Sequence, residues 1–97
     1  MIRHVTLFAW NPEATDKQKQ QVIEELRALP PLLTGLHSFH VGPDLGIIEG
    51  NFDFAVVADF DDAESYLGYR NHPAHRAVVQ QVTTPITKER VSVQYEI

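Results

Sequence analysis

Two histidines and a tyrosine lie within seven residues of one another in this chain, in the segment Tyr69-Arg70-Asn71-His72-Pro73-Ala74-His75. Proline fixes its own φ and favours the first position of a helix, so we expect one helix to end before Pro73 and another to begin there. His75 then lies in the first turn of the second helix, where Tyr69 can approach it across the break. An imidazole and a phenol that face one pocket make a proton-transfer pair. The alternative is that both histidines only cap backbone groups around the break.

A third histidine, His4, shares a strand face with Thr6 and Phe8 in the first residues of the chain. One interpretation is that His4 and Thr6 supply polar groups to an otherwise apolar ligand pocket. The other is that His4 is a core residue with satisfied hydrogen bonds. His37 and His40 are three residues apart on an expected strand, so they point to opposite faces and cannot chelate an ion together.

The histidine pattern does not predict a metal site or a cofactor. His72 and His75 are three residues apart, but Pro73 disturbs the helix between them, and a catalytic zinc site needs a third ligand. The segment Gly42-Pro43-Asp44-Leu45-Gly46 lacks the lysine and the following helix of a phosphate-binding loop. We therefore expect no metal ligands and no cofactor.

Six elements must position these side chains. Alternating apolar residues predict strands, and apolar residues at helical spacing predict helices. The expected strands are 2–9, 36–41, 52–60 and 90–97; the expected helices are 15–29 and a broken segment over 61–84. The order β-α-β-β-α-β predicts an α+β fold of the ferredoxin-like type: one four-stranded antiparallel sheet with the helices on one face.

The first helix is the clearest of these elements. Thr15 is a suitable N-cap residue, and Pro30-Pro31 stops the helix. Its apolar stripe consists of Val22, Ile23, Leu26 and Leu29. Two helices cannot cover both faces of a sheet, so Val5, Leu7, Val57 and the Phe39 side of the second strand are expected on an open apolar face. Such faces mark interfaces, and we predict a homodimer in which two sheets pack face to face.

Composition excludes several classes of protein. The 97 residues carry eight Lys and Arg against thirteen Asp and Glu, for a net charge of −5, and the basic residues are scattered, which argues against a nucleic-acid partner. No apolar run reaches the roughly 18 residues of a membrane span. The absence of cysteine excludes disulfides and thiolate chemistry, and fits a cytoplasmic location. We expect a single soluble domain over 1–97.

The chain resembles the stress-responsive dimeric α/β-barrel (Dabb) domain family over essentially its whole length. The most specific element is Tyr69-x-x-His72-Pro73-x-His75; Ile2 to Trp10, Leu29-Pro30, Val41-Gly42, Phe52 to Ala55 and Phe60-Asp61-Asp62 support it. The resemblance implies a homodimer whose two sheets close into a barrel. Most members of the family have no assigned activity.

One plant member of the family is a cofactor-independent polyketide cyclase, and its motif implies roles for residues of this chain. His75 matches its base and Tyr69 its assisting group, while His4 and His72 match its other histidines. This chain departs from that cyclase at pocket positions, where it has Val22, Ile23 and Leu26 instead of aromatic residues, Val78-Val79 instead of a Phe-Gly pair, and Thr6 instead of an aliphatic residue. A differently shaped pocket is expected to contact a small hydrophobic ligand through His4, Thr6, Phe8, His72, Val22, Ile23, Leu26 and Val79.

Three functions remain open from the sequence. The first is a non-catalytic, stress-associated homodimer of unassigned activity that binds a small hydrophobic molecule. The second is a cyclase or aldolase in which His75 removes a proton next to a carbonyl, Tyr69 holds the developing oxyanion, and His4 and His72 orient them. The third is a haem- or quinol-processing monooxygenase, an activity of related dimeric barrels.

Overall fold

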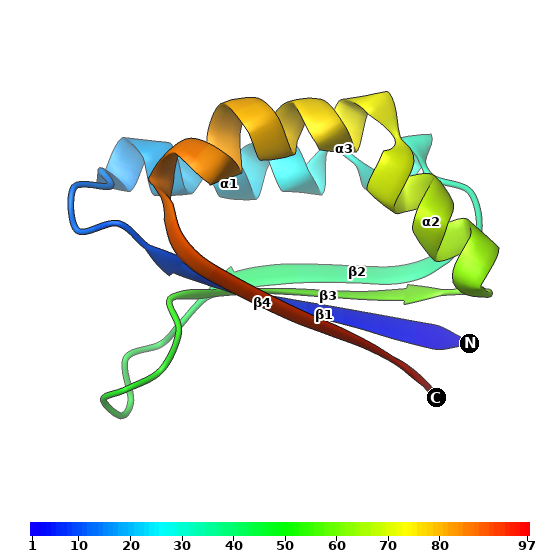
Figure 1. Ribbon diagram of the computed structural model, residues 1–97, viewed down its shortest axis with the longest axis horizontal. Helices are drawn as coiled ribbons and strands as arrows, with labels where there is room; N and C mark the ends of the chain where they lie inside the picture. The colour runs from blue at the N-terminus through cyan, green and yellow to red at the C-terminus, as the bar shows by residue number, and fades with distance from the viewer.

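The computed structural model describes residues 1–97 and contains the predicted order of elements. A strand, a helix and two strands are followed by a helical segment in two parts and by a last strand (Figure 1). Their bounds are β1 (Ile2–Trp10), α1 (Asp16–Arg27), β2 (Leu36–Pro43), β3 (Phe54–Phe60), α2 (Ala63–Asn71), α3 (Pro73–Val78) and β4 (Thr87–Glu96).

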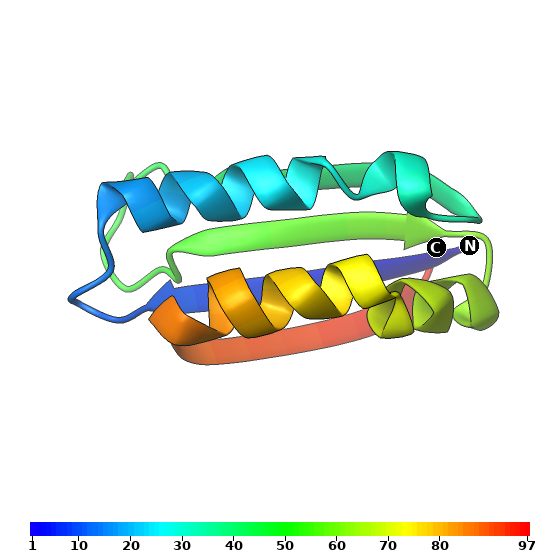
Figure 2. The ribbon, with the colours of Figure 1, turned by 90° about the horizontal axis from the view of Figure 1, so that it is seen from above.

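The four strands form one antiparallel sheet in the order β2-β3-β1-β4. All helices lie on one face of this sheet; α1 runs above its β2 side and α3 above its β4 side (Figure 2). The predicted ferredoxin-like α+β fold is thus confirmed. None of the helices has the length and apolarity that a membrane crossing requires.

Local sequence explains where α1 begins and ends. Thr15 is its N-cap: the threonine hydroxyl accepts from the Gln18 backbone N–H, and the Gln18 side chain accepts from the Thr15 backbone N–H. A short 3₁₀ turn over Pro30–Leu32 follows the helix, as expected where two prolines remove backbone donors. Val22 and Leu26 of the apolar stripe are buried against the sheet.

The break between α2 and α3 is centred on His72 and Pro73. Asp62 caps the start of α2 through the Ser65 N–H, and His72 ends it. His72 also caps α3, because its Nδ1 accepts from the Ala74 N–H at 3.0 Å, and Pro73 occupies the first helical position. The prediction of one helix from Pro73 to residue 84 needs correction: α3 ends at Val78, and a wider π-helical turn over Val79–Thr83 continues the path.

All four strands differ from their predicted bounds, β1 and β2 only by one or two residues at their ends. β3 begins at Phe54 rather than Phe52, because the Asp53 carboxylate accepts from the Trp10 backbone N–H at 2.8 Å in place of a regular ladder bond. β4 begins at Thr87 rather than Arg90, since Thr87 still pairs with Trp10 across a shift in register.

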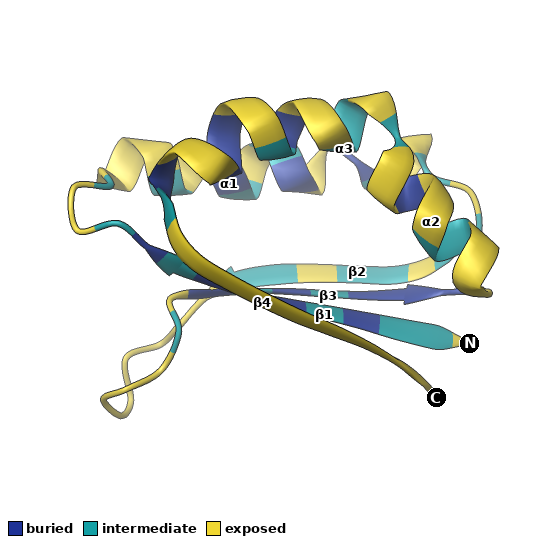
Figure 3. Cartoon of the chain, in the orientation of Figure 1, coloured by how far each residue is buried: buried dark blue, intermediate teal, exposed yellow.

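The core lies between the sheet and the helices (Figure 3). One prediction about its faces was wrong. Phe39 does not belong to the open face, because it lies opposite Ala58, which is fully buried under the helices. The Phe39 side chain packs against the core, and Ser38 and His40 occupy the open side of β2 instead.

The face of the sheet away from the helices is apolar and exposed. On β4 it presents Val91, Val93 and Tyr95, which are 43–55% exposed, next to Val5 and Leu7 of β1. The loop between β2 and β3 extends on this same side of the sheet (Figure 1). Its tip contains Leu45, Ile47 and Ile48, which are 66–82% exposed.

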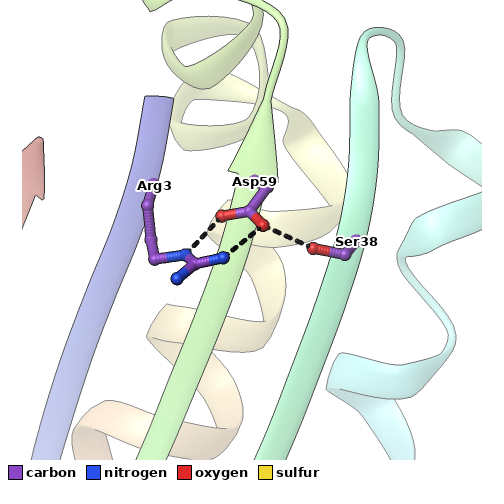
Figure 4. A network of polar contacts seen from close by, with 3 residues as sticks. All are labelled: Arg3, Ser38 and Asp59. Carbon is purple, nitrogen blue, oxygen red and sulfur yellow. Dashed lines mark hydrogen bonds and ion pairs between the residues drawn. The ribbon is translucent and has the colours of Figure 1, made fainter. Parts of the chain in front are cut away.

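One polar network interrupts this face, near the end where β1 begins. Arg3 Nε and Nη2 donate to the two carboxylate oxygens of Asp59 at 2.8 and 2.9 Å, and the Ser38 hydroxyl donates to the same carboxylate at 2.9 Å (Figure 4). These hydrogen bonds join β1, β3 and β2. They lower the pKa of Asp59 to about 2, the Arg3 hydrogen bond being the largest cause.

Candidate functional site

A cavity of about 560 Å³ lies between the sheet and the α2–α3 side of the helical layer. Its floor comes from alternate residues of β1, namely His4, Thr6 and Phe8. Its walls come from α2, α3 and the turn that follows, including Tyr69 and His75. Residues from the two ends of the chain and from the predicted helix break therefore meet in one hollow.

Tyr69 and His75 come together as the sequence predicts. Their ring centroids are 4.1 Å apart, although Tyr69 lies near the end of α2 and His75 in the first turn of α3. The change of direction at His72 and Pro73 makes this contact, because a continuous helix would place residues six apart on different turns and partly different faces. Tyr69 is 5% exposed, whereas His75 is half-buried.

The hydrogen bonding of His75 leaves one ring nitrogen free. The carbonyl oxygen of Arg70 lies 3.2 Å from Nδ1, and a carbonyl can only accept, so Nδ1 carries the hydrogen. In the neutral ring Nε2 then holds the lone pair. Burial lowers the pKa of His75; the hydrogen bond to the Arg70 carbonyl offsets part of this effect, and the charges of Arg90 and Arg70 add to the lowering. His75 is therefore neutral near pH 7 and has the protonation state of a base.

Tyr69 has the opposite character. Its hydroxyl takes part in none of the protein's hydrogen bonds, and because no fully buried side-chain polar atom lacks a partner, this hydroxyl is accessible from the cavity that Tyr69 lines. Burial raises the pKa of Tyr69 well above its usual value, and the nearby Tyr66 contributes. The hydroxyl stays protonated at neutral pH, and so it can donate a hydrogen bond to a bound molecule.

His4 is the buried member of the group. Its Nδ1 accepts from the Gln94 amide at 2.8 Å, and its Nε2 lies 2.8 Å from the Thr6 hydroxyl. Burial, the largest cause, and the positive charge of Arg90 lower the pKa of His4 to about 4. Its ring lies 5.9 Å from that of Tyr69. Both of its nitrogens are occupied, so His4 supports the floor of the cavity as a neutral ring.

The structure separates the predicted ligand-contacting residues into two groups. His4, Thr6, Phe8, Leu26 and Val79 line the cavity together with Tyr69 and His75. Three others do not line it: Val22 is fully buried, Ile23 packs against the core, and the His72 ring caps α3. A helix stripe has a core side and a cavity side, and its spacing alone does not distinguish them.

Sequence reasoning missed the polar part of the wall. Arg70, Arg76 and Arg90 line the cavity, as do Gln80 and three threonines that follow α3. The arginines looked scattered in the sequence. Two signals could have found them: Arg70 and Arg76 flank the Tyr-x-x-His-Pro-x-His element, and Arg90 alternates with the apolar residues of the last strand.

The remaining histidines lie elsewhere. His37 and His40 are both exposed on β2, and His37 pairs with Asp61. Nowhere in the chain do three His, Asp or Glu side chains converge in an arrangement that could hold a metal ion.

Comparison with known proteins gives consistent similarities. The model of the Stress responsive A/B Barrel Domain (Dabb) matches residues 2–97. The uncharacterized protein SCO4036 of Streptomyces coelicolor is 32% identical over 82 residues, which cover 81% of this chain and 84% of that protein.

Two solved structures extend the comparison. A dimeric ferredoxin-like protein from Thermobifida fusca is 43% identical with a TM-score of 0.92, covering 99% of this chain and 90% of its own. A hydroxynitrile lyase from Passiflora edulis is 20% identical with a TM-score of 0.85, covering 99% of this chain and 92% of its own. At the latter identity the similarity shows a shared fold.

Proposed function

This chain belongs to the stress-responsive A/B barrel domain (Dabb) family, and we propose that it is a homodimeric, cofactor-independent enzyme that moves a proton on a small carbonyl compound. The observation that carries the proposal is that the rings of His75 and Tyr69 lie close together and line the same cavity. His75 offers an unpaired Nε2 in its basic form, and Tyr69 offers an unpaired hydroxyl in its donating form.

The chemistry follows from these two groups. His75 Nε2 takes a proton from the carbon next to the carbonyl, and the electrons of that C–H bond move toward the carbonyl oxygen. The Tyr69 hydroxyl donates a hydrogen bond to the resulting enolate oxygen. The enolate then regains a proton or attacks a second carbonyl carbon, which is the bond-forming step of a cyclase or aldolase. His4 holds the floor below the pair and takes no part in the proton transfer.

The resemblance to the plant olivetolic acid cyclase supports the roles of His75 and Tyr69. It does not extend to the substrate, because the positions where that cyclase has aromatic pocket residues hold Val22, Ile23 and Leu26 here. Two of these three side chains do not line the cavity. The carbonyl compound is therefore expected to differ from a long polyketide.

The homodimer rests on two observations. The relative from Thermobifida fusca, 43% identical, is dimeric. The open face of the sheet presents Val91, Val93 and Tyr95 to solvent in a single copy of the chain, and a second sheet would bury them.

Deuterium exchange tests the catalytic role directly. We expect the wild-type protein to accelerate exchange of the α-hydrogens of small ketones in D₂O, with and without an acid group, as followed by ¹H NMR. His75→Gln should slow the exchange about 100-fold, the usual size of a general-base contribution, and Tyr69→Phe should slow it less. The control is His72→Asn, which keeps a side-chain acceptor at the helix cap and lies outside the cavity wall.

A second readout is the titration of the histidine rings. His75 should titrate below pH 6.5 in the wild type and also in Tyr69→Phe, because burial is the main cause of its lowered pKa and the phenyl ring preserves that burial. If ketones bind in the cavity but exchange no faster than in buffer, the chain is a binding protein and the catalytic proposal is wrong. If His72→Asn remains folded but exchanges the α-hydrogens as slowly as His75→Gln does, the assignment of His75 as the base is wrong.

A further inference from the structure

We propose that the cavity selects an anionic carbonyl compound, whose acid group is held by Arg70, Arg76 and Arg90. This inference rests on the proposed function, since it names the substrate class of the same site. It also differs from the small hydrophobic ligand that the sequence predicts. An acid group, carboxylate or phosphate, is the chemistry that guanidinium groups recognise through paired hydrogen bonds.

The three arginines reach the cavity from three different elements. Arg70 lies in the last turn of α2 and Arg76 in α3. Arg90 lies on β4 opposite Phe8 of β1, so its side chain starts from the helix-covered face of the sheet. Segments far apart in the chain thus bring cations to one hollow.

None of these arginines is paired within the protein. The contacts of basic side chains with carboxylates in the chain join Arg3 with Asp59 and His37 with Asp61. Arg3, by contrast, shows how this protein pairs a guanidinium when its role is structural: it donates two hydrogen bonds to one carboxylate. The cavity arginines have no such partner, which leaves their donors free for a ligand.

The charge of the cavity is opposite to that of the chain. Thirteen Asp and Glu outnumber eight Lys and Arg overall, yet three of the eight basic residues line the cavity and no acidic residue does. A small cavity with one sign of charge and a low-dielectric floor attracts ligands of the other sign. The field of the remaining chain would repel an anion, so this local excess is what makes anion binding favourable.

The rest of the wall suits an amphipathic molecule. Phe8, Val56 and Leu26 supply apolar surface, and Tyr69 and His75 supply the groups proposed for the carbonyl. A ligand with an apolar body, a ketone and an acid group would satisfy all three parts of the cavity. A purely hydrophobic ligand would leave the arginines without partners.

The test compares one acid with its neutral analogue. The probes are 4-oxo-4-phenylbutanoate and 4-oxo-4-phenylbutanamide, which share the aryl ketone and differ in charge. Binding to the full chain is measured by calorimetry and by NMR shifts of the cavity residues. We expect the acid to bind at least tenfold more tightly than the amide. Raising the salt concentration from about 20 to about 500 mM should weaken binding of the acid and leave binding of the amide nearly unchanged, because salt screens exposed charges.

Variants locate the effect. Arg90→Gln and Arg76→Gln should each weaken acid binding several-fold without changing amide binding. Arg27→Gln is the matched control, because Arg27 lies in the last turn of α1 and does not line the cavity. Competition by acetate and by inorganic phosphate at equal ionic strength then shows which kind of acid group the arginines prefer. Equal affinity for acid and amide, or wild-type acid affinity in both cavity variants, would overturn the inference.

The failure of this inference is distinguishable from that of the proposed function. If the acid binds selectively but its α-hydrogens exchange no faster than in buffer alone, the proposed anion selection is supported and the proposed proton transfer is wrong. If the protein accelerates α-hydrogen exchange of the acid and the amide equally and binds them with equal affinity, the proposed proton transfer is supported and the proposed anion selection is wrong.

Discussion

His4 and His75 share one cavity but have different hydrogen-bond environments. His4 has hydrogen-bond partners at both ring nitrogens and a pKa of about 4. His75 has a partner at Nδ1 only. A ring that is fully paired is fixed in place, whereas a ring with a free nitrogen can exchange protons with a ligand. Although both residues are histidines, this difference in hydrogen bonding identifies His4 as a supporting residue and His75 as the reactive one.

The buried His4 should make stability depend on pH. Its pKa falls from about 6.5 in the unfolded chain to about 4 in the folded protein, so the unfolded state binds more protons between these values. The stabilisation is fully present above pH 6.5 and is lost as the pH falls toward 4. The expected loss reaches about 3 kcal/mol at pH 4, because each unit of pKa difference corresponds to about 1.4 kcal/mol. Urea unfolding at fixed protein concentration measures it.

The control for this prediction is His4→Gln, which should flatten the dependence between pH 6.5 and 4. Asp59 titrates in a separate window, since its folded-state pKa of about 2 makes its contribution disappear below pH 3.8. The charged or titratable groups that act on His4 are Arg90 and His75. An unchanged slope in His4→Gln would assign the dependence to His75 or another group and contradict the prediction.

At the scale of elements, Gly35 connects the turn before β2 with the start of α2 through a hydrogen bond and a close contact. Its φ of +75° lies in the left-handed region, and its carbonyl accepts from the Asp61 N–H at 2.8 Å. A methyl group at this position would lie 2.8 Å from Ser65 Cβ, closer than van der Waals contact allows. The position therefore requires glycine for both conformation and space.

Gly35→Ala and Gly46→Ala separate these two reasons. Gly46 has a similar φ of +71° but open space around it, so its substitution carries only the conformational cost of roughly 1–2 kcal/mol. Gly35→Ala adds the overlap with Ser65, which typically costs about 1–3 kcal/mol more. Thermal and urea unfolding of the two variants measure the difference. Equal destabilisation would show that Ser65 and α2 move away without cost.

Sequence patterns predicted most of the elements because each one has local chemistry at its ends. Thr15 begins α1 and Pro73 begins α3 at the predicted positions, and Asp62 caps α2 one residue after the predicted start at residue 61. The face of β2 was harder, because its register depends on pairing with β3 and on an irregularity between Leu36 and Ser38. No local pattern encodes that pairing.

The site was predictable where its residues are adjacent in sequence. The pair of Tyr69 and His75 follows from the helix break between them. Arg90 was missed because its place opposite Phe8 arises only when β4 pairs with β1. Ile23 was expected at the ligand, but helix phase turns it to the core. Long-range placement, rather than residue type, limits what the sequence reveals.

At the scale of the whole molecule, the sheet separates two tasks. Its helix-covered face holds the cavity and most of the core. Its other face presents exposed apolar residues, and no helix of the chain covers that face (Figure 3). The Arg3–Asp59–Ser38 network places a satisfied polar cluster near one end of that open face. A second copy packed there would bury the apolar residues and leave both cavities on the outside of the dimer.

Val93→Asp tests this arrangement. Val93 is 55% exposed on the open face and lies opposite Val5, so a second sheet would bury it. In a two-fold symmetric interface one substitution introduces two unpaired carboxylates, and burying such charges is strongly unfavourable. Sedimentation velocity at micromolar concentration should show a dimer for the wild type and a folded monomer for Val93→Asp. Leu67→Asp is the matched control, since Leu67 is 48% exposed on α2 and should leave the dimer intact. A dimeric Val93→Asp would place the interface on another surface.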